Sequence, residues 1–381
     1  MNATKKLLSG VRVVDFSRVL AGPYATAMLA DQGAEVIKVE MPGHGDDSRH
    51  LGPFTDSGST YFTGLNRGKR SIEADLKDPE HHARLLDLIA EADVVVENFR
   101  PGVAAKLGLS YEDAKAVKPD IVYASISGFG QHGAQAGRPA YDTVIQALSG
   151  LMASTGFPEG SPTRIGESIA DVSAGVFAAF GISTALFHRQ TTGEGTHLDI
   201  PMLDVMLAMQ PTNASLHAAG SAPARVGNRH PVSAPFDTYR AADGLIVIAV
   251  ANDRLFGTLA ATLGKPELAT DPRFATDGQR SDNDEVLRVE IEEFTTGRTV
   301  DELCAIFDAA GVPNSPVLDF DEAVDGPIGS GRGLTATDPR TGHAYLGHPL
   351  LVDGARPAST LPAPHLGEHN ADFAPADTAS H

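Results

Sequence analysis

The stretch VRVVDFSRVLAGPYATAMLADQGAEVIKVE, residues 11–40, decides the fold class of this chain. It opens with a short apolar run at 11–16, which is typical of a buried strand. Residues 21–33 follow with helical spacing and reach a glycine, a common helix end. The run EVIKVE at 35–40 predicts a second strand. A strand, a helix and a strand in such close succession indicate a right-handed βαβ unit, whose two strands are parallel.

The same alternation continues over residues 1–200. A helix predicted at about 79–92 precedes the apolar run DVVVE at 93–97, and another helix precedes IVYASIS at 121–127. Strands separated by helices predict a doubly wound parallel sheet, covered on both faces, in an α/β domain. The loop after the first strand reads SRVLAGP and contains no GxGxxG, so these residues do not indicate a dinucleotide site.

A change of pattern then introduces a second, smaller unit. Residues 198–225 contain a Met-rich run, MLDVMLAMQ, that predicts a long helix, and then a Gly/Ala/Pro/Ser stretch that is typical of a linker. Beyond it, FDTYR at 236–240 and LIVIAV at 245–250 flank a turn at Asp243-Gly244, which predicts a β-hairpin. Helices are predicted at Asp253–Leu263, Asp284–Phe294 and Val300–Ala310.

Composition narrows the classes of function. The chain has 381 residues, of which 42% are hydrophobic and 21% charged, and its net charge is −19. This acidity argues against sequence-independent nucleic-acid binding and against a polybasic membrane contact. The single cysteine, Cys304, excludes an intrachain disulfide and a cysteine-rich metal site. We recognise no signal peptide and no long unbroken apolar segment, so we expect a soluble cytoplasmic protein.

The negative charge is unevenly distributed, which bears on where an anionic ligand would bind. Residues 1–120 carry a net charge of −3 and the remainder carries −16. An anionic small molecule would therefore approach the first third more easily, unless these charges serve only solubility. The cations of this part include Arg12, Arg18, Lys38, Lys69, Arg70, Lys77, Arg100 and Lys106.

Asp171 is the candidate for chemistry that the residues themselves suggest. It lies in IGESIADVSAGVF, at the start of a helically spaced run. A carboxylate at that place can cap the helix by accepting backbone N–H bonds. Beside helix-start amides it can equally serve as a nucleophile. The residues alone leave both interpretations open. The 14 histidines show no metal-ligand spacing, and we expect no metal.

Ordered sequence blocks run through nearly the whole chain. They include VVDFSRVLAGPYATAMLADQGAEVIKVE, GDDSR, ADVVVENFRPGVAAKLGL, YASISGFG, TGFPEGSPTRIGESIADVSAG and LGEHN. Each block alone is a modest signal, but in this order the chain resembles the class III CoA-transferases. The resemblance implies coenzyme A and acyl-CoA as substrates, a small carboxylic acid as second substrate, and no prosthetic group.

The resemblance also implies covalent catalysis by Asp171. In the family an aspartate at this position attacks the acyl-CoA thioester, and the released thiolate returns to form an aspartyl-CoA thioester. The alternative is an acyl-CoA racemase or epimerase of the same superfamily. Racemases carry a His-Asp pair where this chain has Tyr141 and Asp142. A tyrosine, with an ordinary pKa of about 10, is a poor base for that reaction.

Several positions match residues that bind CoA in the family. Two of the family's arginines are replaced, by Met41 and by Lys106, and Arg49, Arg70 or Arg100 are candidates to compensate. The matching positions are Arg18, Val19, Ala21, Ala74, Lys77, Asn98, Phe99, Lys106, Leu107, Tyr141 and Met202.

Two further departures concern the acid substrates. Leu20 stands where formyl-CoA transferase has a glutamine, and the tetraglycine loop of that enzyme is missing. We therefore expect oxalate and formate to be poor substrates.

The resemblance also implies how the chain is divided into domains and linkers. Residues 1–197, completed by 335–381, would form a large doubly wound α/β domain, and 226–315 a smaller α+β domain. Residues 198–225 and 316–334 would be long linkers, which let two chains interlock as a homodimer. No nucleic acid or membrane partner is implied.

Overall fold

The structure, a computed structural model, describes residues 5–359 and 361–373. The chain forms two compact units. The first is drawn from residues 1–151, 165–212 and 327–381, and the second from 152–164 and 213–326.

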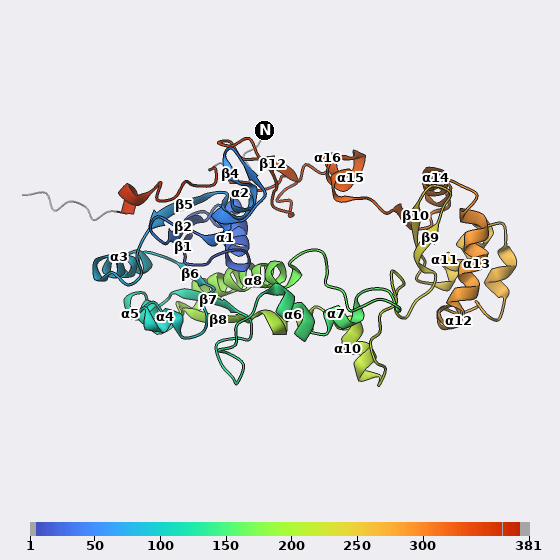
Figure 1. Cartoon of the computed structure of the whole chain (residues 1–381), viewed down its shortest axis with the longest axis horizontal. Coiled ribbons are helices and arrows are strands. Elements are labelled where there is room, and N and C mark those ends of the chain that lie inside the picture. The colour runs from blue at the N-terminus through green and yellow to red at the C-terminus, as the bar shows by residue number, and fades with distance from the viewer. Residues whose placement is uncertain (1–4, 360, 374–381) are drawn as a thin grey trace, which may run out of the picture. The chain divides into compact units, whose positions relative to one another are not determined.

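A six-stranded parallel sheet organises the first unit (Figure 1). The strand order is β5-β2-β1-β6-β7-β8. The strands β2 and β5 therefore lie on one side of β1, and the later strands β6, β7 and β8 lie on the other. This confirms the predicted α/β class with a parallel central sheet. The strands are β1 (Arg12–Asp15), β2 (Glu35–Glu40), β5 (Lys69–Glu73), β6 (Val94–Glu97), β7 (Val122–Ser127) and β8 (Thr196–Pro201).

The two edge strands of this sheet were not predicted. β5 reads KRSIE and β8 reads THLDIP, each with charged or polar residues among few apolar ones. Every second residue of the first half of β8 is exposed, since an edge strand is covered less completely than a central one. The continuous apolar pattern that marks a buried parallel strand is absent from both sequences, although no residue of β5 is exposed.

Helices cover both faces of the sheet (Figure 1). On one face, α1 (Ala21–Asp31) and α8 (Ile169–Thr192) share a core with alternate residues of the central strands. On the other face, α3 (Pro79–Ala90) and α5 (Tyr111–Val117) form a second core with the intervening residues. The alternation follows from the two-residue period of a strand, whose side chains point to opposite faces.

Helix α8 is the one helix, within the described residues, that is long and apolar enough to cross a membrane by length and composition. Its Ala174, Ala178, Ile182 and Leu186 are buried in the core of the first unit. Packing against the sheet therefore accounts for one side of the helix, while Phe177, Phe180 and Phe187 are exposed on the other. The predicted cytoplasmic location stays a prediction.

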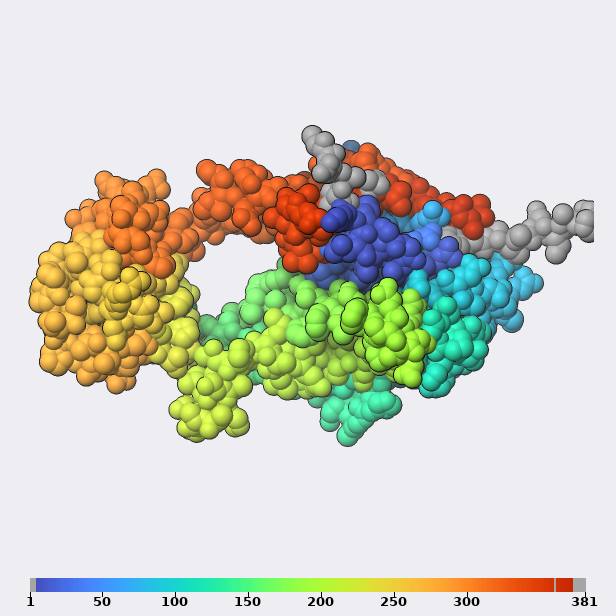
Figure 2. Space-filling view, turned by 180° about the vertical axis from the view of Figure 1, so that it is seen from behind, coloured from blue at the N-terminus to red at the C-terminus, as the bar shows by residue number. Residues whose placement is uncertain are grey.

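Segments from the two ends of the chain lie side by side on the first unit, blue beside red in Figure 2. Lys5 forms an ion pair with Asp353 (2.7 Å), and the ammonium of Lys6 donates to the carbonyl of Ala358. The backbone N–H of His369 donates to the carbonyl of Ser71 in β5. The last part of the predicted domain segment 335–381, residues 374–381, lies outside the described residues.

The second unit contains a three-stranded antiparallel sheet, in the order β11-β10-β9. β9 (Phe236–Arg240) and β10 (Leu245–Ala249) form the predicted hairpin, which is confirmed. The three predicted helices are also confirmed, with ends within one residue of the prediction. They are α11 (Asp253–Thr262), α13 (Asp284–Thr295) and α14 (Val300–Ala310), and β11 spans Asn314–Pro316.

The segments predicted as linkers contain regular structure. The Met-rich run does not form a long helix: α9 spans only Met202–Ala208, after β8, and α10 spans Pro211–Ala218. Pro201 and Pro211 limit α9, because a proline fits only at a helix start. The range 316–334 holds α15 (Phe320–Asp325) and α16 (Pro327–Ser330). The predicted domain boundaries themselves stay a prediction.

The remaining elements are short. They are η1 (Asp47–His50), β3 (Phe54–Thr55), β4 (Gly58–Ser59), α2 (Thr60–Asn66), α4 (Val103–Lys106), α6 (Asp142–Leu148), α7 (Leu151–Ser154), η2 (Pro266–Thr270), α12 (Asp277–Asp282), β12 (Thr335–Thr337), β13 (Ala344–Leu346) and η3 (Asn370–Phe373).

Candidate active site

A cavity of about 420 Å³ opens at the carboxyl ends of the central strands of the first unit. Its lining comes from the loops that follow β1 and β6 and from the end of β7. β1 and β6 are neighbours whose connections leave in opposite directions, which creates a crevice above them where ligands of doubly wound folds bind. The lining includes Arg18, Val19, Leu20, Ala21, Asp47, Asn98, Phe99, Arg100, Ser127, Arg138, Tyr141, Asp171 and Met202.

Close packing of two helices brings Asp171 to this cavity. A Cβ at Gly175 would lie 2.7 Å from the carbonyl oxygen of Ala21, so only glycine lets α8 approach the start of α1 this closely. Asp171 lies one turn before Gly175. The nucleophile candidate and the first residue of α1 therefore line the same cavity.

Asp171 is the third residue of α8 and is not its N-cap; Ser168 occupies that position. The capping interpretation of Asp171 is therefore wrong. No hydrogen bond to the Asp171 carboxylate is found among the described residues. Burial, and next the negative charge of Asp142, raise the pKa of Asp171 to about 7. A half-buried carboxylate without a partner, facing a cavity, is typical of a group kept for chemistry.

Asp142 and Gln146 of α6 fix the chain just before Asp171. One oxygen of Asp142 accepts the backbone N–H of Ala170 (2.8 Å), and the other accepts the amide of Gln146 (2.7 Å). The Gln146 side chain also accepts the backbone N–H of Ile165 (2.9 Å). The start of α8 is therefore bound to α6 through buried side chains.

Three arginines line the cavity, namely Arg18, Arg100 and Arg138. Arg18 lies 3.4 Å from the carboxylate of Asp47. Neither Arg100 nor Arg138 forms an ion pair within the described part of the chain. Of the cations in the first third of the chain, Arg18 and Arg100 therefore line the cavity and could meet an anionic ligand there. Arg138, from a later loop, lines it as well.

Most other cations that the sequence suggested are engaged elsewhere. Lys38 and Lys69 are fully buried in ion pairs, Arg12 binds Glu35 and Glu91, and Arg70 lies near Glu35 and Asp372. Of the candidates to replace the family arginine at Met41, only Arg100 lines the cavity. Arg49 is held by two hydrogen bonds to the buried Glu40 (2.8 and 2.7 Å).

The structure brings eight of the twelve sequence-predicted site residues to the cavity: Arg18, Val19, Ala21, Asn98, Phe99, Tyr141, Asp171 and Met202. The other four do not line it. Ala74 and Leu107 belong to the second core, and Lys77 and Lys106 are exposed. The CoA-binding roles of all these residues stay predictions.

Sequence reasoning missed Ser127 and Arg138 as individual site residues. The Ser127 hydroxyl is buried, lines the cavity and has no hydrogen-bond partner among the described residues. Its place at the end of the predicted strand 121–127 was a usable signal, because carboxyl ends of parallel strands face the ligand crevice. Arg138 sits in an irregular loop and carried no such signal. No group of three or more His, Cys, Asp or Glu within the described ranges could hold a metal ion.

A carboxylate at a helix start lies beside a cavity with three arginines, at the switch point of a doubly wound sheet, and this arrangement fits an enzyme that binds an anionic substrate. Residues 8–370 match the sequence profile of CoA-transferase family III, and the chain belongs to this family of enzymes.

Relatives of known name support the assignment. The chain is 44% identical to the acetyl-CoA:oxalate CoA-transferase of Acetobacter aceti, over 95% of this chain and 93% of the relative. It is 39% identical to the succinate–glutarate CoA-transferase of Agrobacterium fabrum, over 96% and 94%. A crystal structure of a CAIB/BAIF family protein from Brucella suis matches with a TM-score of 0.85 and 40% identity, over 97% of this chain and 99% of that one.

Proposed function

We propose that this enzyme moves CoA from an acyl-CoA to a free carboxylic acid through an aspartyl-CoA thioester on Asp171. The observation that carries the proposal is the Asp171 carboxylate, which faces the arginine-lined cavity without a hydrogen-bond partner among the described residues. A carboxylate used for structure would be paired, because an unpaired buried charge is costly.

The reaction divides into two exchanges of the same kind. The Asp171 carboxylate attacks the thioester carbonyl and expels the CoA thiolate, which leaves a mixed anhydride. The thiolate attacks the aspartyl carbonyl of that anhydride, forms aspartyl-CoA and releases the donor acid as its carboxylate. The acceptor carboxylate then attacks the carbonyl of aspartyl-CoA and expels the CoA thiolate, which leaves a second mixed anhydride. The thiolate attacks the acyl carbon of the acceptor in that anhydride, forms the new acyl-CoA and expels the Asp171 carboxylate. This regenerates Asp171, and no proton is consumed.

The surroundings of Asp171 suit these steps. Arginines bind phosphate and carboxylate groups strongly, and three of them line the cavity. The first-turn amides of α8 favour negative charge near its start. A pKa of about 7 leaves a substantial fraction of Asp171 ionised at neutral pH, and its partial desolvation makes the carboxylate a better nucleophile.

The substrate pair is proposed only as a class, acyl-CoA and a small mono- or dicarboxylic acid. The names of the two relatives give acetyl-CoA with oxalate, and succinate with glutarate. The first name runs against our expectation that oxalate is a poor substrate, an expectation based on Leu20 and the missing tetraglycine loop. A panel of acids therefore has to include oxalate.

Intact-protein mass spectrometry tests the intermediate. The wild-type enzyme and Asp171→Ala are incubated briefly with acetyl-, succinyl-, glutaryl- and oxalyl-CoA. We expect a CoA-sized adduct on the wild type alone, removed by hydroxylamine. No adduct from any donor, in protein that binds CoA by calorimetry, would overturn the proposal. Exchange of the acyl α-proton for deuterium without an acceptor acid would instead support the racemase alternative.

We also propose that two chains form a homodimer. The solvent side of α8 exposes Val176, Phe177, Phe180 and Phe187 by 45, 42, 67 and 68%. Several exposed phenylalanines on one helix are unusual for the free surface of a monomer. Light scattering at falling concentration tests the proposal, and an active monomer would overturn it.

A further inference from the structure

Val19, in the wall of the cavity, has a left-handed backbone conformation, with φ = 67°. This conformation suits glycine, and for a β-branched residue it is a genuine outlier. Strain of this kind persists only where surrounding contacts enforce it, and it is often found at functional sites. Contacts from other segments must therefore hold the loop Ser17–Leu20 in place.

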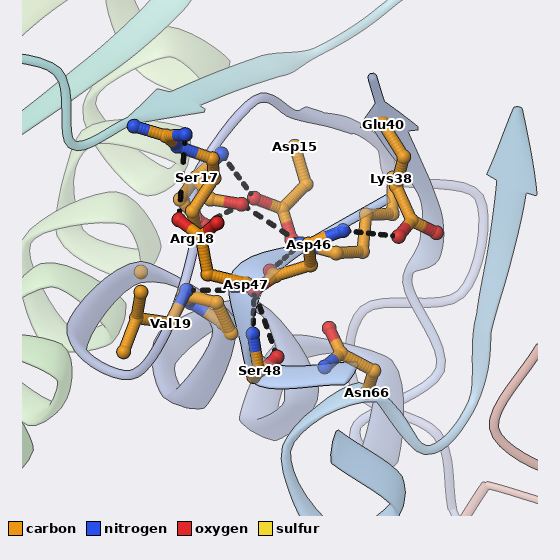
Figure 3. Close-up of polar contacts among 12 residues, drawn as sticks. Asp15, Ser17, Arg18, Val19, Lys38, Glu40, Asp46, Asp47, Ser48 and Asn66 are labelled. Carbon is orange, nitrogen blue, oxygen red and sulfur yellow. Dashed lines mark hydrogen bonds and ion pairs between the residues drawn. The ribbon is translucent and has the colours of Figure 1, made fainter. Parts of the chain in front are cut away.

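Side chains from two other segments bind the backbone of this loop. The backbone N–H of Val19 donates to an oxygen of Asp46 (3.0 Å; Figure 3). Next to it, the Asn98 side chain accepts the backbone N–H of Arg18 (2.9 Å) and donates to the Arg18 carbonyl (2.8 Å). The loop is thereby attached to the segment before η1 and to the segment after β6.

Asp46 is itself held by a buried cation. The Lys38 ammonium lies 2.7 Å from the second oxygen of Asp46, and neither side chain is exposed. The same ammonium donates to the Ser17 carbonyl (2.8 Å; Figure 3). Lys38 therefore binds the loop at Ser17, and Asp46 binds it at Val19. The backbone N–H and hydroxyl of Ser48 both donate to the oxygen that faces Val19 (2.8 Å each).

Two further ion pairs complete a neutral, buried cluster. Lys69 binds Asp15 (3.0 Å), and Arg49 binds Glu40 (2.7 Å), which also accepts the backbone N–H of Asp46. Burial by itself would raise the pKa of Asp46, but the adjacent Lys38 ammonium holds it well below its usual range. Asp46 is thus an anion throughout the working pH range.

A buried ion pair is a poor source of stability, because desolvation offsets the attraction between its charges. Apolar residues of similar size would pack as well but could not bind the N–H of Val19 or the carbonyl of Ser17. The geometry of the pair therefore indicates a role in positioning.

We propose that Asp46 and Lys38 are positioning residues, which hold Val19 in its left-handed conformation and so shape the wall that contacts the acyl-CoA. The inference rests on the proposed function for the identity of the ligand. Asp46 does not touch the reacting atoms; it acts through the backbone of Arg18, Val19 and Leu20, which line the cavity.

Asp46→Asn tests the proposal, with Asp31→Asn as the matched control. Asp31 is equally buried and pairs with Arg67 (2.6 Å), but it ends α1 far from the cavity. We expect both variants to lower the unfolding temperature. Only Asp46→Asn is expected to weaken CoA binding in calorimetry, and to raise the KM for acyl-CoA, by about tenfold. Equal KM values in the two variants would overturn the proposal.

A double-mutant cycle with Val19→Gly tests the mechanism itself. Glycine adopts positive φ without the cost that valine bears, so the restraint from Asp46 should matter less in its presence. We expect Asp46→Asn to raise KM by about tenfold in the wild-type background, and by about threefold or less in the Val19→Gly background. Additive effects would contradict the proposal.

Ser48→Ala is a milder variant for the case that Asp46→Asn does not fold. It removes one hydrogen bond that orients Asp46 and keeps the ion pair with Lys38. We expect a KM increase of about threefold with little change in unfolding temperature, and an unchanged KM would count against the proposal. If the wild-type enzyme forms no CoA adduct, the proposed function is refuted and not the role of Asp46. The comparison of CoA binding by Asp46→Asn and Asp31→Asn in calorimetry would still test whether Asp46 positions the loop.

Discussion

At a single-residue level, the site combines a carboxylate without a hydrogen-bond partner with two arginines that form no ion pair among the described residues. Asp171 gains no hydrogen bond in the described structure, and Arg100 and Arg138 gain no ion pair there. Each of these groups would be more stable with a partner, and a substrate with phosphate and carboxylate groups supplies partners.

Replacing Asp171 should abolish CoA transfer and stabilise the fold at alkaline pH. The folded-state pKa of about 7 lies above the ordinary value of 3.8, so the folded protein holds the proton more tightly than the unfolded chain. Stability therefore falls as the pH rises from about 4 to 7, and the loss persists above pH 7. Raising the pKa by about three corresponds to at most about 4 kcal/mol, so we expect Asp171→Asn to exceed the wild type by up to that amount, or a few degrees in Tm, at pH 8, and to match it near pH 4.

Thermal unfolding at the two pH values measures this difference. Asp87→Asn, an exposed carboxylate on α3, is the control and should behave like the wild type at both. An Asp171→Asn variant that is less stable than the wild type at pH 8 would show that the carboxylate has a structural role.

The ionisation of Asp171 should also govern the rate. Only the carboxylate attacks a thioester, so kcat/KM for acyl-CoA should rise about tenfold per pH unit below pH 7 and level off above pH 8. Initial rates between pH 5 and 9 measure the profile. A flat profile would mean that another group limits the reaction or that substrate-free Asp171 is already ionised at pH 5.

The two unpaired arginines should contribute to substrate binding. We expect Arg100→Gln and Arg138→Gln each to raise the KM for acyl-CoA by about tenfold, because a hydrogen bond to a charged group contributes about 1.5–3 kcal/mol. Steady-state kinetics measure this, with the exposed Arg84→Gln of α3 as control. If all three variants share the wild-type KM, the cavity does not bind the anionic part of the substrate.

At the scale of elements, the contact between α1 and α8 sets the site. α1 is rich in small residues, and α8 begins Ile-Ala-Asp-Val-Ser-Ala-Gly, so the two helices approach closely. The start of each helix borders the cavity, α1 with Ala21 and α8 with Asp171. Any change in the spacing of the helices would therefore move Asp171 relative to the opposite wall of the cavity.

Gly175→Ala should impair both stability and activity. The new Cβ would lie 2.7 Å from the Ala21 carbonyl oxygen, a backbone atom that cannot move aside cheaply. We expect a loss of about 2 kcal/mol and a clear decrease in kcat, measured by denaturant unfolding and steady-state rates. Gly257→Ala in α11 is the control: no atom lies within 4 Å of its new Cβ, so it should be neutral or slightly stabilising. Equal effects of the two substitutions would contradict this account.

At the scale of the whole molecule, the chain forms two units, and the first exposes an apolar face on α8. The face carries Phe177, Phe180 and Phe187, on the side of the helix away from the buried Ala174, Ala178 and Ile182. A helix with apolar residues on both sides is expected where a second packing partner covers the outer side. A second copy of the chain is the partner that we propose.

Phe180→Asp should weaken self-association, because it places a charge in the apolar face. We expect a shift towards monomer in sedimentation velocity at low micromolar concentration, with loss of activity if the site needs the partner. Val117→Asp, at the end of α5 on the opposite face of the sheet, is the control and should leave the distribution unchanged. A Phe180→Asp protein that sediments like the wild type would argue that α8 lies outside the interface.

Features that rest on local patterns could be predicted from the amino-acid sequence. The β1–α1–β2 unit, the β9–β10 hairpin, and the position of Asp171 in the first turn of α8 follow from periodicity and turn chemistry over short ranges. The loops after β1 and β6 were placed near the ligand by family resemblance, and the cavity is lined by both.

Which of these residues lie together became visible only in the folded chain. The fold placed Lys38 and Lys69 in buried ion pairs, left Arg100 and Arg138 without an ion pair among the described residues, and put Ser127 in the cavity without a hydrogen-bond partner there. The edge strands β5 and β8 likewise depend on neighbours distant in sequence, since their own apolar patterns are weak. The reason is the same throughout: charge pairing, burial and edge pairing are set by contacts across the fold, and a local pattern carries no information about them.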